Sequence, residues 1–113
     1  MNPGELYWAD LGSGRRPVLV VSRNEFNRGT YVTVALLTTA NFDVRSQLPN
    51  CVPVRAGEFG IIRDCVIQCE TITLLNQSDV DIDAGAIGII DDERLRTVIL
   101  AIGHVLDANC EPN

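Results

Sequence analysis

The chain contains the stretch Gly12-Ser13-Gly14-Arg15-Arg16-Pro17-Val18-Leu19-Val20-Val21-Ser22. In it, two glycines and two arginines are followed by a proline and then by four apolar residues. The two glycines favour a turn, and Pro17 restricts the residue before it to an extended backbone. The apolar, mostly β-branched run that follows is typical of a buried strand. The stretch therefore predicts a strand over residues 18–21 that holds Arg16 at its entrance, where a guanidinium can donate two hydrogen bonds to a phosphate. A solvated Arg15–Arg16 pair in a turn is the alternative interpretation.

The length of 113 residues indicates one domain that spans residues 1–113, and the hydrophobic content of 46% indicates that it folds. No apolar run reaches the length of a membrane-spanning helix, and no secretory leader is recognisable. We therefore expect a cytoplasmic protein that does not contact membranes. The chain has four cysteines, which are expected to be reduced: Cys51, Cys65, Cys69 and Cys110. Because no cluster of cysteine or histidine has metal-ligand spacing, we expect neither a metal nor another cofactor.

Charge is distributed unevenly along the chain. The formal net charge of -6 argues against an ordinary nucleic-acid-binding protein. Residues 1–63 nevertheless hold seven arginines against five acidic residues, a net of +2, whereas residues 64–113 hold two arginines against ten acidic residues, a net of -8. All nine basic residues are arginines, which suit bidentate contacts with phosphates. A genomic bias towards arginine explains the absence of lysine equally well.

Alternating apolar residues and β-branched runs predict a mainly β protein. The predicted strands cover residues 4–10, 18–21, 30–39, 51–54, 65–75 and 84–90. A proline inside the fourth of these marks it as an edge strand. Tyr7 and Trp8, in the first strand, are interpreted as core or dimer contacts. Longer loops are expected over residues 40–50 and 55–64.

Two helical segments are predicted. Residues 24–29 favour one short helical turn, with Phe26 anchored in the core. Asp91 is expected to cap the only substantial helix. The apolar residues of this helix recur at helical spacing and should pack on the sheet: Leu95, Val98, Ile99, Ile102 and Leu106. Residues 108–113, after the helix, are expected to be loose. Together the elements predict an α+β, mainly β fold, a small antiparallel barrel closed by a C-terminal amphipathic helix.

Four motifs, in this order, resemble the MazF/PemK family of toxin ribonucleases over nearly the whole chain. They are Gly4-Glu5-Leu6-Tyr7-Trp8-Ala9-Asp10-Leu11, Arg16-Pro17-Val18-Leu19-Val20-Val21-Ser22 with Asn27-Arg28 after it, Leu37-Thr38-Thr39, and Arg63-Asp64-Cys65-Val66-Ile67 leading to Glu70-Thr71-Ile72. The resemblance implies an SH3-like barrel that forms a homodimer. It also implies the toxin of a type II toxin–antitoxin system, restrained by a cognate antitoxin. Such toxins cut single-stranded mRNA at short sequences without a metal and leave a 2′,3′-cyclic phosphate and a 5′-hydroxyl.

The resemblance assigns two residues to catalysis: the family's arginine corresponds to Arg16 and its strand-closing threonine to Thr38. Attack by a 2′-hydroxyl requires that this hydroxyl lose its proton, that the phosphorane be stabilised and that the 5′-oxygen gain a proton. Arg16 can supply positive charge, and Thr38 can donate a hydrogen bond to a phosphate oxygen. An ordinary threonine at a strand end is the alternative for Thr38. Further contacts with RNA are expected from Arg15, Arg23, Thr39, Asn41 and Gln68.

The chain departs from its relatives at two places. The first loop, residues 11–14, is too short for the Ser-Glu-Gln triplet of many relatives, so a glutamate proposed there as general base is missing. Some relatives have an arginine in place of Gln68 and an aspartate in place of Glu70, and a neutral amide does not replace a cation at a phosphate. Glu70 becomes the candidate catalytic base or base-reading group, with an exposed strand glutamate as the alternative.

Two other functions stay open on the sequence alone. The gyrase-poisoning branch of the same fold binds a protein and cuts nothing, and its members end in a Trp-Gly-Ile that the tail over residues 110–113 lacks. The other possibility is an inactive toxin-like dimer that serves as a binding module. For the antitoxin we expect an acidic or amphipathic segment that competes with RNA for Arg15, Arg16 and Arg23.

Overall fold

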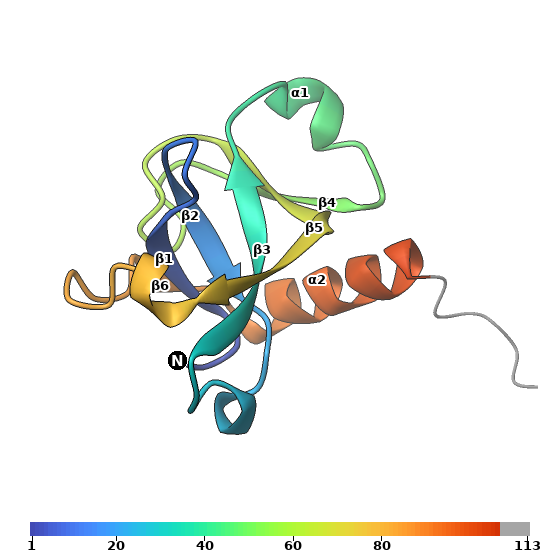
Figure 1. Ribbon diagram of the computed structural model, residues 1–113. Helices are drawn as coiled ribbons and strands as arrows, with labels where there is room; N and C mark the ends of the chain where they lie inside the picture. The colour runs from blue at the N-terminus through green and yellow to red at the C-terminus, as the bar shows by residue number, and fades with distance from the viewer. Residues whose placement is uncertain (107–113) are drawn as a thin grey trace, which may run out of the picture.

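The computed structural model describes residues 1–106 as one curled, six-stranded sheet with a long helix against one face and short helices in the connections (Figure 1). The strands are β1 (Glu5–Asp10), β2 (Arg15–Val20), β3 (Tyr31–Thr38), β4 (Cys51–Val54), β5 (Cys65–Asn76) and β6 (Gly88–Ile89). Their order in the sheet is β4-β5-β3-β2-β1-β6, and every pairing is antiparallel. The mainly β fold is confirmed as a half-barrel, and β4 is the edge strand that its proline predicted.

Strand β2 begins at Arg15, earlier than the predicted start at residue 18. The hairpin before it is closed by a hydrogen bond of 3.0 Å from the Leu11 N–H to the Gly14 carbonyl, and Gly14 has a φ of 140°. Arg15 lies opposite Asp10, and Arg16 lies opposite Ala9. Both arginines therefore belong to the strand, and because successive strand residues point to opposite faces, their side chains diverge.

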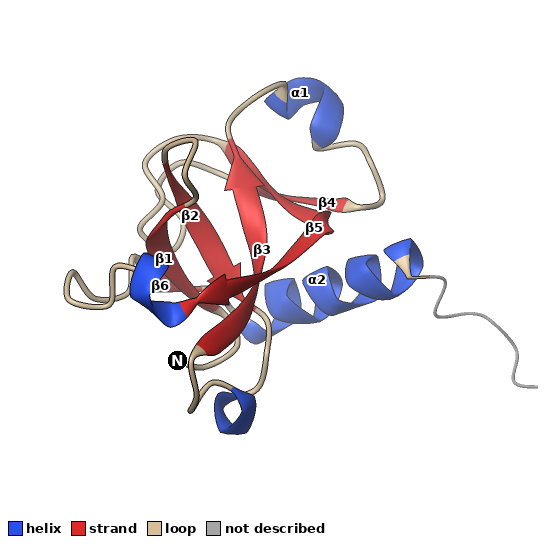
Figure 2. Cartoon of the chain, in the orientation of Figure 1, coloured by secondary structure: helices blue, strands red, loops and turns tan. Residues whose placement is uncertain are grey.

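Helix α2 (Asp92–Val105) packs along one face of the sheet (Figure 2). It begins as predicted, because the Asp91 carboxylate accepts a hydrogen bond of 2.6 Å from the Arg94 N–H. Two of the five predicted inner residues are wrong: Ile99 and Leu106 are 55% and 71% exposed. Ile99 is rotated by roughly 100° from its neighbour on the inner stripe, and Leu106 follows the last helical residue. The inner stripe consists of Leu95, Val98, Ala101 and Ile102.

The short helices η1 (Asn24–Phe26) and α1 (Phe42–Arg45) lie in the connections on either side of β3. The helical turn predicted at residues 24–29 is present, but Phe26 is 73% exposed and is not a core anchor. The buried residue of this connection is Asn27, whose amide group donates to the carbonyls of Met1 (3.0 Å) and Ser22 (2.8 Å). Polar bonds rather than apolar packing therefore attach this turn to the sheet. Helix α1 falls in a segment that was predicted to be a loop.

The curl of the sheet creates two apolar clusters, one on each face. The cluster beneath α2 includes Leu6, Leu19, Ala35, Leu37, Ile67 and Val98. The second cluster includes Tyr7, Val18, Val20, Val32, Val34 and Leu75, so the core position predicted for Tyr7 is confirmed. Cys51, Cys65 and Cys69 are buried free thiols, as predicted, whereas Cys110 and the predicted loose tail lie outside the described residues. Over residues 1–106, no helix is long and apolar enough to cross a membrane.

Candidate functional site

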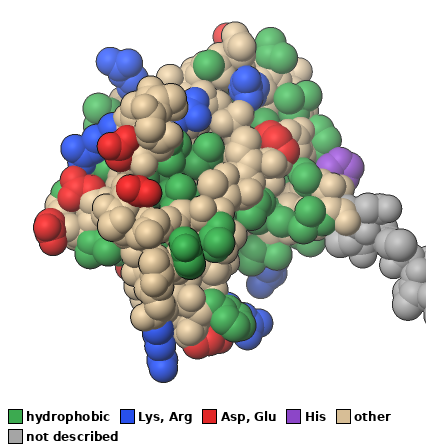
Figure 3. Space-filling model, in the orientation of Figure 1, with side chains coloured by type: hydrophobic (Ala, Val, Ile, Leu, Met, Phe, Trp, Pro, Cys, Tyr) green, Lys and Arg blue, Asp and Glu red, His purple; other side chains and the backbone are tan. Residues whose placement is uncertain are grey.

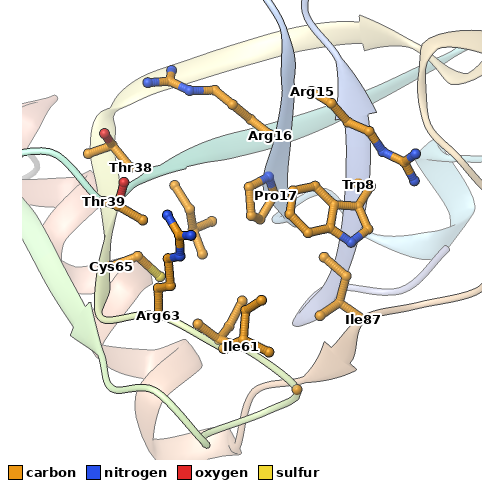
Figure 4. A pocket seen from close by; sticks show the side chains of 13 residues that line it. Trp8, Arg15, Arg16, Pro17, Thr38, Thr39, Ile61, Arg63, Cys65 and Ile87 are labelled. Carbon is orange, nitrogen blue, oxygen red and sulfur yellow. The ribbon is translucent and has the colours of Figure 1, made fainter.

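A cavity of about 570 Å³ opens where β2 begins and β3 ends. Figure 4 shows its walls, which come from β1, β2, the end of β3, and the segments around residues 60–65 and 87. The cavity brings together four of the predicted site residues, Arg15, Arg16, Thr38 and Thr39. In Figure 3 several basic side chains lie at the top of the molecule with acidic ones near them, and other basic side chains lie at the bottom. The structure therefore places two basic and two hydroxyl side chains of the predicted site around one cavity.

The two residues assigned to catalysis lie at the ends of neighbouring strands. Strands β2 and β3 pair as far as Val18 opposite Leu36, and Arg16 and Thr38 each lie two residues beyond this pair. Both residues line the cavity. Arg16 and Thr38 can therefore contact one phosphate, although they are far apart in the sequence.

Thr38 is 7% exposed, and its hydroxyl oxygen accepts a hydrogen bond of 3.2 Å from the Ala40 N–H. A hydroxyl that accepts from the backbone keeps its own proton available as a donor. The backbone bond orients the Thr38 side chain, and its O–H can donate to an oxygen of a bound anion. Thr39, the next residue, is exposed at the rim of the same cavity.

The two adjacent arginines differ in their surroundings. Arg15 forms an ion pair of 2.6 Å with Asp81, and its guanidinium lies over the Trp8 ring, 5.5 Å from the centroid. Arg16 is half-buried and forms no ion pair within residues 1–106. Of the two, Arg16 is the cation whose charge is available to a ligand.

Several cavity residues were not predicted from the sequence. Trp8, for which a core or dimer contact was predicted, is partly buried and lines the cavity beside Pro17, its partner across β1 and β2. Arg63, Ile61 and Ile87 complete the wall. The motif that contains Arg63 was recognised, but no local pattern indicates where a loop side chain points.

A close backbone contact positions this part of the wall. A Cβ atom on Gly60 would lie 2.2 Å from the carbonyl oxygen of Ile87, and Gly60 has a φ of 80°, in the region that favours glycine. The backbone N–H of Gly57 also donates to the Ile61 carbonyl at 2.7 Å. The segment predicted as a mobile loop is therefore packed closely against the residues before β6.

The thiol of Cys65 lines the cavity but does not provide a nucleophile. Burial, and to a smaller extent the charge of the neighbouring Asp64, raises its pKa to about 11. A thiol with that pKa is protonated at neutral pH, and only the thiolate is a strong nucleophile. Chemistry in this cavity therefore depends on the arginines and threonines.

Four predicted RNA-contacting or catalytic residues lie elsewhere. Glu70 and Asn41 line a second cavity of about 450 Å³, where the Glu70 carboxylate accepts a hydrogen bond of 2.9 Å from the Asn50 amide. Gln68 is half-buried on β5 and lines neither cavity. Arg23 precedes η1, at the opposite end of β2 from Arg16, and lies 3.9 Å from Glu25. The structure thus separates Glu70 and Arg23 from the Arg16–Thr38 pair.

Comparisons with known proteins agree with these features. A family model described as the PemK-like, MazF-like toxin of type II toxin–antitoxin systems matches residues 2–106. The chain is 32% identical over 110 residues to endoribonuclease MazF6 of Mycobacterium tuberculosis, a match that covers 91% of this chain and 94% of the relative. Endoribonuclease MazF2 of Mycobacterium bovis matches to the same extent.

Solved structures share the fold. The Mycobacterium tuberculosis toxin MazF-mt6 superposes with a TM-score of 0.77 at 27% identity, covering 91% of this chain and 96% of that one. A mycobacterial endoribonuclease in complex with its cognate antitoxin superposes with a TM-score of 0.80 at 22% identity, covering 99% of both chains. Since the family model spans almost all of the described residues and relatives are 32% identical over nearly their full length, the chain belongs to the PemK-like, MazF-like toxins of type II toxin–antitoxin systems.

Proposed function

We propose that the protein is the toxin of a toxin–antitoxin pair and acts as a metal-independent endoribonuclease on single-stranded mRNA. The observation that carries the proposal is the placement of Arg16 and Thr38 on facing strands at one cavity. Relatives at 32% identity bear the name endoribonuclease, which supports the same reaction class. We also propose that the protein cuts the RNA at short, specific nucleotide sequences.

The proposed reaction is an internal phosphoryl transfer. The 2′-oxygen attacks the adjacent phosphorus, the bond from phosphorus to the 5′-oxygen breaks, and the products are a 2′,3′-cyclic phosphate and a 5′-hydroxyl. One proton leaves the 2′-oxygen and one is gained by the 5′-oxygen, so the step is balanced. Negative charge gathers on the non-bridging oxygens in the transition state, where the Arg16 guanidinium and the Thr38 hydroxyl can donate to them.

Charge stabilisation supplies most of the rate in this proposal. The residues within 1–106 that line the cavity include no aspartate, glutamate or histidine, so water or a phosphate oxygen takes the 2′-hydroxyl proton. Glu70 is assigned to base reading rather than to proton transfer, because it lies with Asn41 and Asn50 in the second cavity. Carboxylate and amide groups are suited to hydrogen bonds with the edges of unpaired bases.

The proposed partners are RNA, a cognate antitoxin and a second copy of the chain. One solved relative is an endoribonuclease in complex with its cognate antitoxin, and others are complexes of MazE with MazF from Deinococcus radiodurans. A symmetric dimer would double the surface that one small barrel offers to RNA. Because mRNA is the proposed substrate, the cytoplasm is the proposed location.

The test uses purified protein, a long single-stranded RNA and EDTA. Discrete fragments with a 2′,3′-cyclic phosphate and a 5′-hydroxyl are expected, and the chelator should not change the rate. An RNA that lacks the 2′-hydroxyl at a mapped cut site should resist cleavage. Cutting of that RNA would contradict the mechanism. If the RNA stays intact and the protein inhibits gyrase, the gyrase-poisoning function is supported. If the RNA stays intact and gyrase is not inhibited, the non-catalytic function is supported.

A further inference from the structure

We propose that Arg63 is the second phosphate-binding cation of the cavity and holds the phosphate next to the one that is cut. The inference rests on the proposed ribonuclease function and deepens it. Arg63 lines the same cavity as Arg16 and Thr39. In Figure 4 its side chain extends from the lower wall towards the middle of the cavity, whereas Arg16 extends along the upper rim near Thr38.

The backbone that carries Arg63 is anchored on both sides. Ile61 is 6% exposed, its N–H donates to the Glu58 carbonyl at 2.9 Å, and its carbonyl accepts from Gly57. Cys65, two residues beyond Arg63, is 2% exposed and begins β5. An exposed side chain on an anchored backbone can contact a ligand without first ordering a loop, which lowers the entropic cost of binding.

The charge of Arg63 is available although an acidic residue follows it directly. The Asp64 carboxylate pairs with Arg55 at 3.3 Å and accepts a hydrogen bond of 2.8 Å from the Ala56 N–H. Arg63 itself forms no ion pair among the described residues. Asp81 forms an ion pair with Arg15. The two arginines of the cavity whose charges no ion pair within residues 1–106 neutralises are therefore Arg16 and Arg63.

Beside these two cations the wall is apolar. Trp8, Pro17, Ile61 and Ile87 line the part of the cavity away from Thr38 and Thr39 (Figure 4), and the volume of about 570 Å³ is in the range of small-ligand sites. A nucleotide unit has the complementary chemistry, because a base and ribose lie between two phosphates. Arg16 at the cut phosphate and Arg63 at the neighbouring phosphate would hold one nucleotide over this apolar wall.

The test measures binding apart from cleavage. The probe is a fluorescein-labelled pool of random-sequence 2′-O-methyl RNA, which cannot be cut because its 2′-oxygens are blocked. Wild type, Arg63→Ala, Arg63→Lys and Arg96→Ala are titrated at several salt concentrations. Arg96 is exposed on α2 and lines neither cavity, so its substitution controls for the loss of one positive charge.

Arg63→Ala should weaken binding roughly tenfold, because it removes a charge-assisted hydrogen bond. The slope of log K against log salt should become less steep by about 0.7, the value for one phosphate contact on a single strand. Arg63→Lys should keep the slope and recover part of the affinity. In cleavage assays Arg63→Ala should raise KM more than it lowers kcat.

The inference is overturned if wild type cuts RNA while Arg63→Ala retains the slope and affinity of Arg96→Ala; the proposed function then stands. If wild type neither binds nor cuts RNA, both proposals fail. Thermal unfolding of each variant shows whether the fold is retained. If the Arg63→Ala variant unfolds at a lower temperature than wild type, the Arg63→Lys variant decides. Weaker RNA binding by Arg63→Lys at an unchanged salt slope supports the inference, and unchanged RNA affinity contradicts it.

Discussion

Asp81 neutralises Arg15, one of the arginines that line the cavity. Their side chains meet at 2.6 Å, and the Asp81 N–H donates to the Trp8 carbonyl at 2.9 Å, so the acidic segment after η2 (Gln77–Asp79) is attached to β1. The Arg15 guanidinium also lies over the Trp8 ring. An RNA phosphate must therefore compete with Asp81 for Arg15, whereas no ion pair within residues 1–106 competes for Arg16.

Asp81→Asn should tighten RNA binding. The gain should not exceed about fivefold, because an ion pair between partly exposed side chains contributes about 1 kcal/mol or less. Asparagine can still accept the hydrogen bond that Asp81 receives from the Ala84 N–H at 3.2 Å, so the segment should keep its shape. Titration with the 2′-O-methyl RNA pool measures the effect. Asp83→Asn removes the same charge from an exposed neighbour, and equal gains from both substitutions would contradict a specific competition for Arg15.

Arg16→Ala should lower the cleavage rate roughly a hundredfold or more, because the charge that develops in the transition state loses its main donor. RNA binding should fall much less, since other arginines still attract the backbone. Arg16→Lys should restore part of the rate, because it keeps the charge but not the planar pair of donors. Single-turnover rates give the comparison, and an Arg16→Ala variant as fast as wild type would rule out a catalytic role.

Thr38→Val should slow cleavage by roughly ten- to hundredfold, the effect of removing a hydrogen bond to a charged group. Valine preserves the shape of this nearly buried side chain but can neither donate to a phosphate nor accept from the Ala40 N–H. Thr38→Ser keeps the hydroxyl and should retain most of the rate. Similar rates for the serine and valine variants would assign Thr38 to packing alone.

Gly60→Ala should destabilise the protein more than Gly57→Ala. Both glycines have positive φ, 80° and 95°, so alanine is strained at either position by roughly 1 kcal/mol or more. Only at Gly60 would the new Cβ also meet backbone, the Ile87 carbonyl oxygen at 2.2 Å, whereas Gly57 faces open space. Urea unfolding of the two variants measures the difference. Equal losses would mean that the wall of the cavity is not held by this contact.

Stability should fall as the pH is lowered below the ordinary carboxyl range. The Arg94 guanidinium, 2.9 Å from Glu58, and a hydrogen bond from the Arg55 N–H lower the pKa of Glu58 below its ordinary value of 4.5. A carboxyl with a lower pKa in the folded state stabilises the protein above its unfolded pKa, and this contribution is lost as the pH falls through the folded pKa.

Unfolding free energies between neutral pH and about pH 3 test this dependence. Glu58→Gln should flatten the curve, because glutamine cannot gain a proton or form the ion pair. Glu93→Gln, a matched substitution on the exposed face of α2, should leave most of the dependence in place. A curve for Glu58→Gln that parallels wild type would exclude Glu58 as a source of acid sensitivity.

Local patterns in the sequence were sufficient for most of the secondary structure. Strands β3, β4 and β5 were predicted within a residue of their observed ends, and Asp91 caps α2 as expected, because alternation and capping depend on residues close together in the chain. Burial was harder to predict. Phe26 and Ile99 are apolar but exposed, since no element within residues 1–106 covers them.

The sequence alone identified Arg16 and Thr38, because each stands in a recognisable motif at the end of a strand. Their meeting at one cavity, the addition of Arg63 and the separation of Glu70 depended on the tertiary structure. Strand register and the packing of Gly60 against Ile87 are set by contacts between residues distant in the chain, which no local pattern encodes. For the same reason only the structure revealed that Arg15 is neutralised by an aspartate 66 positions away while Arg16 is not.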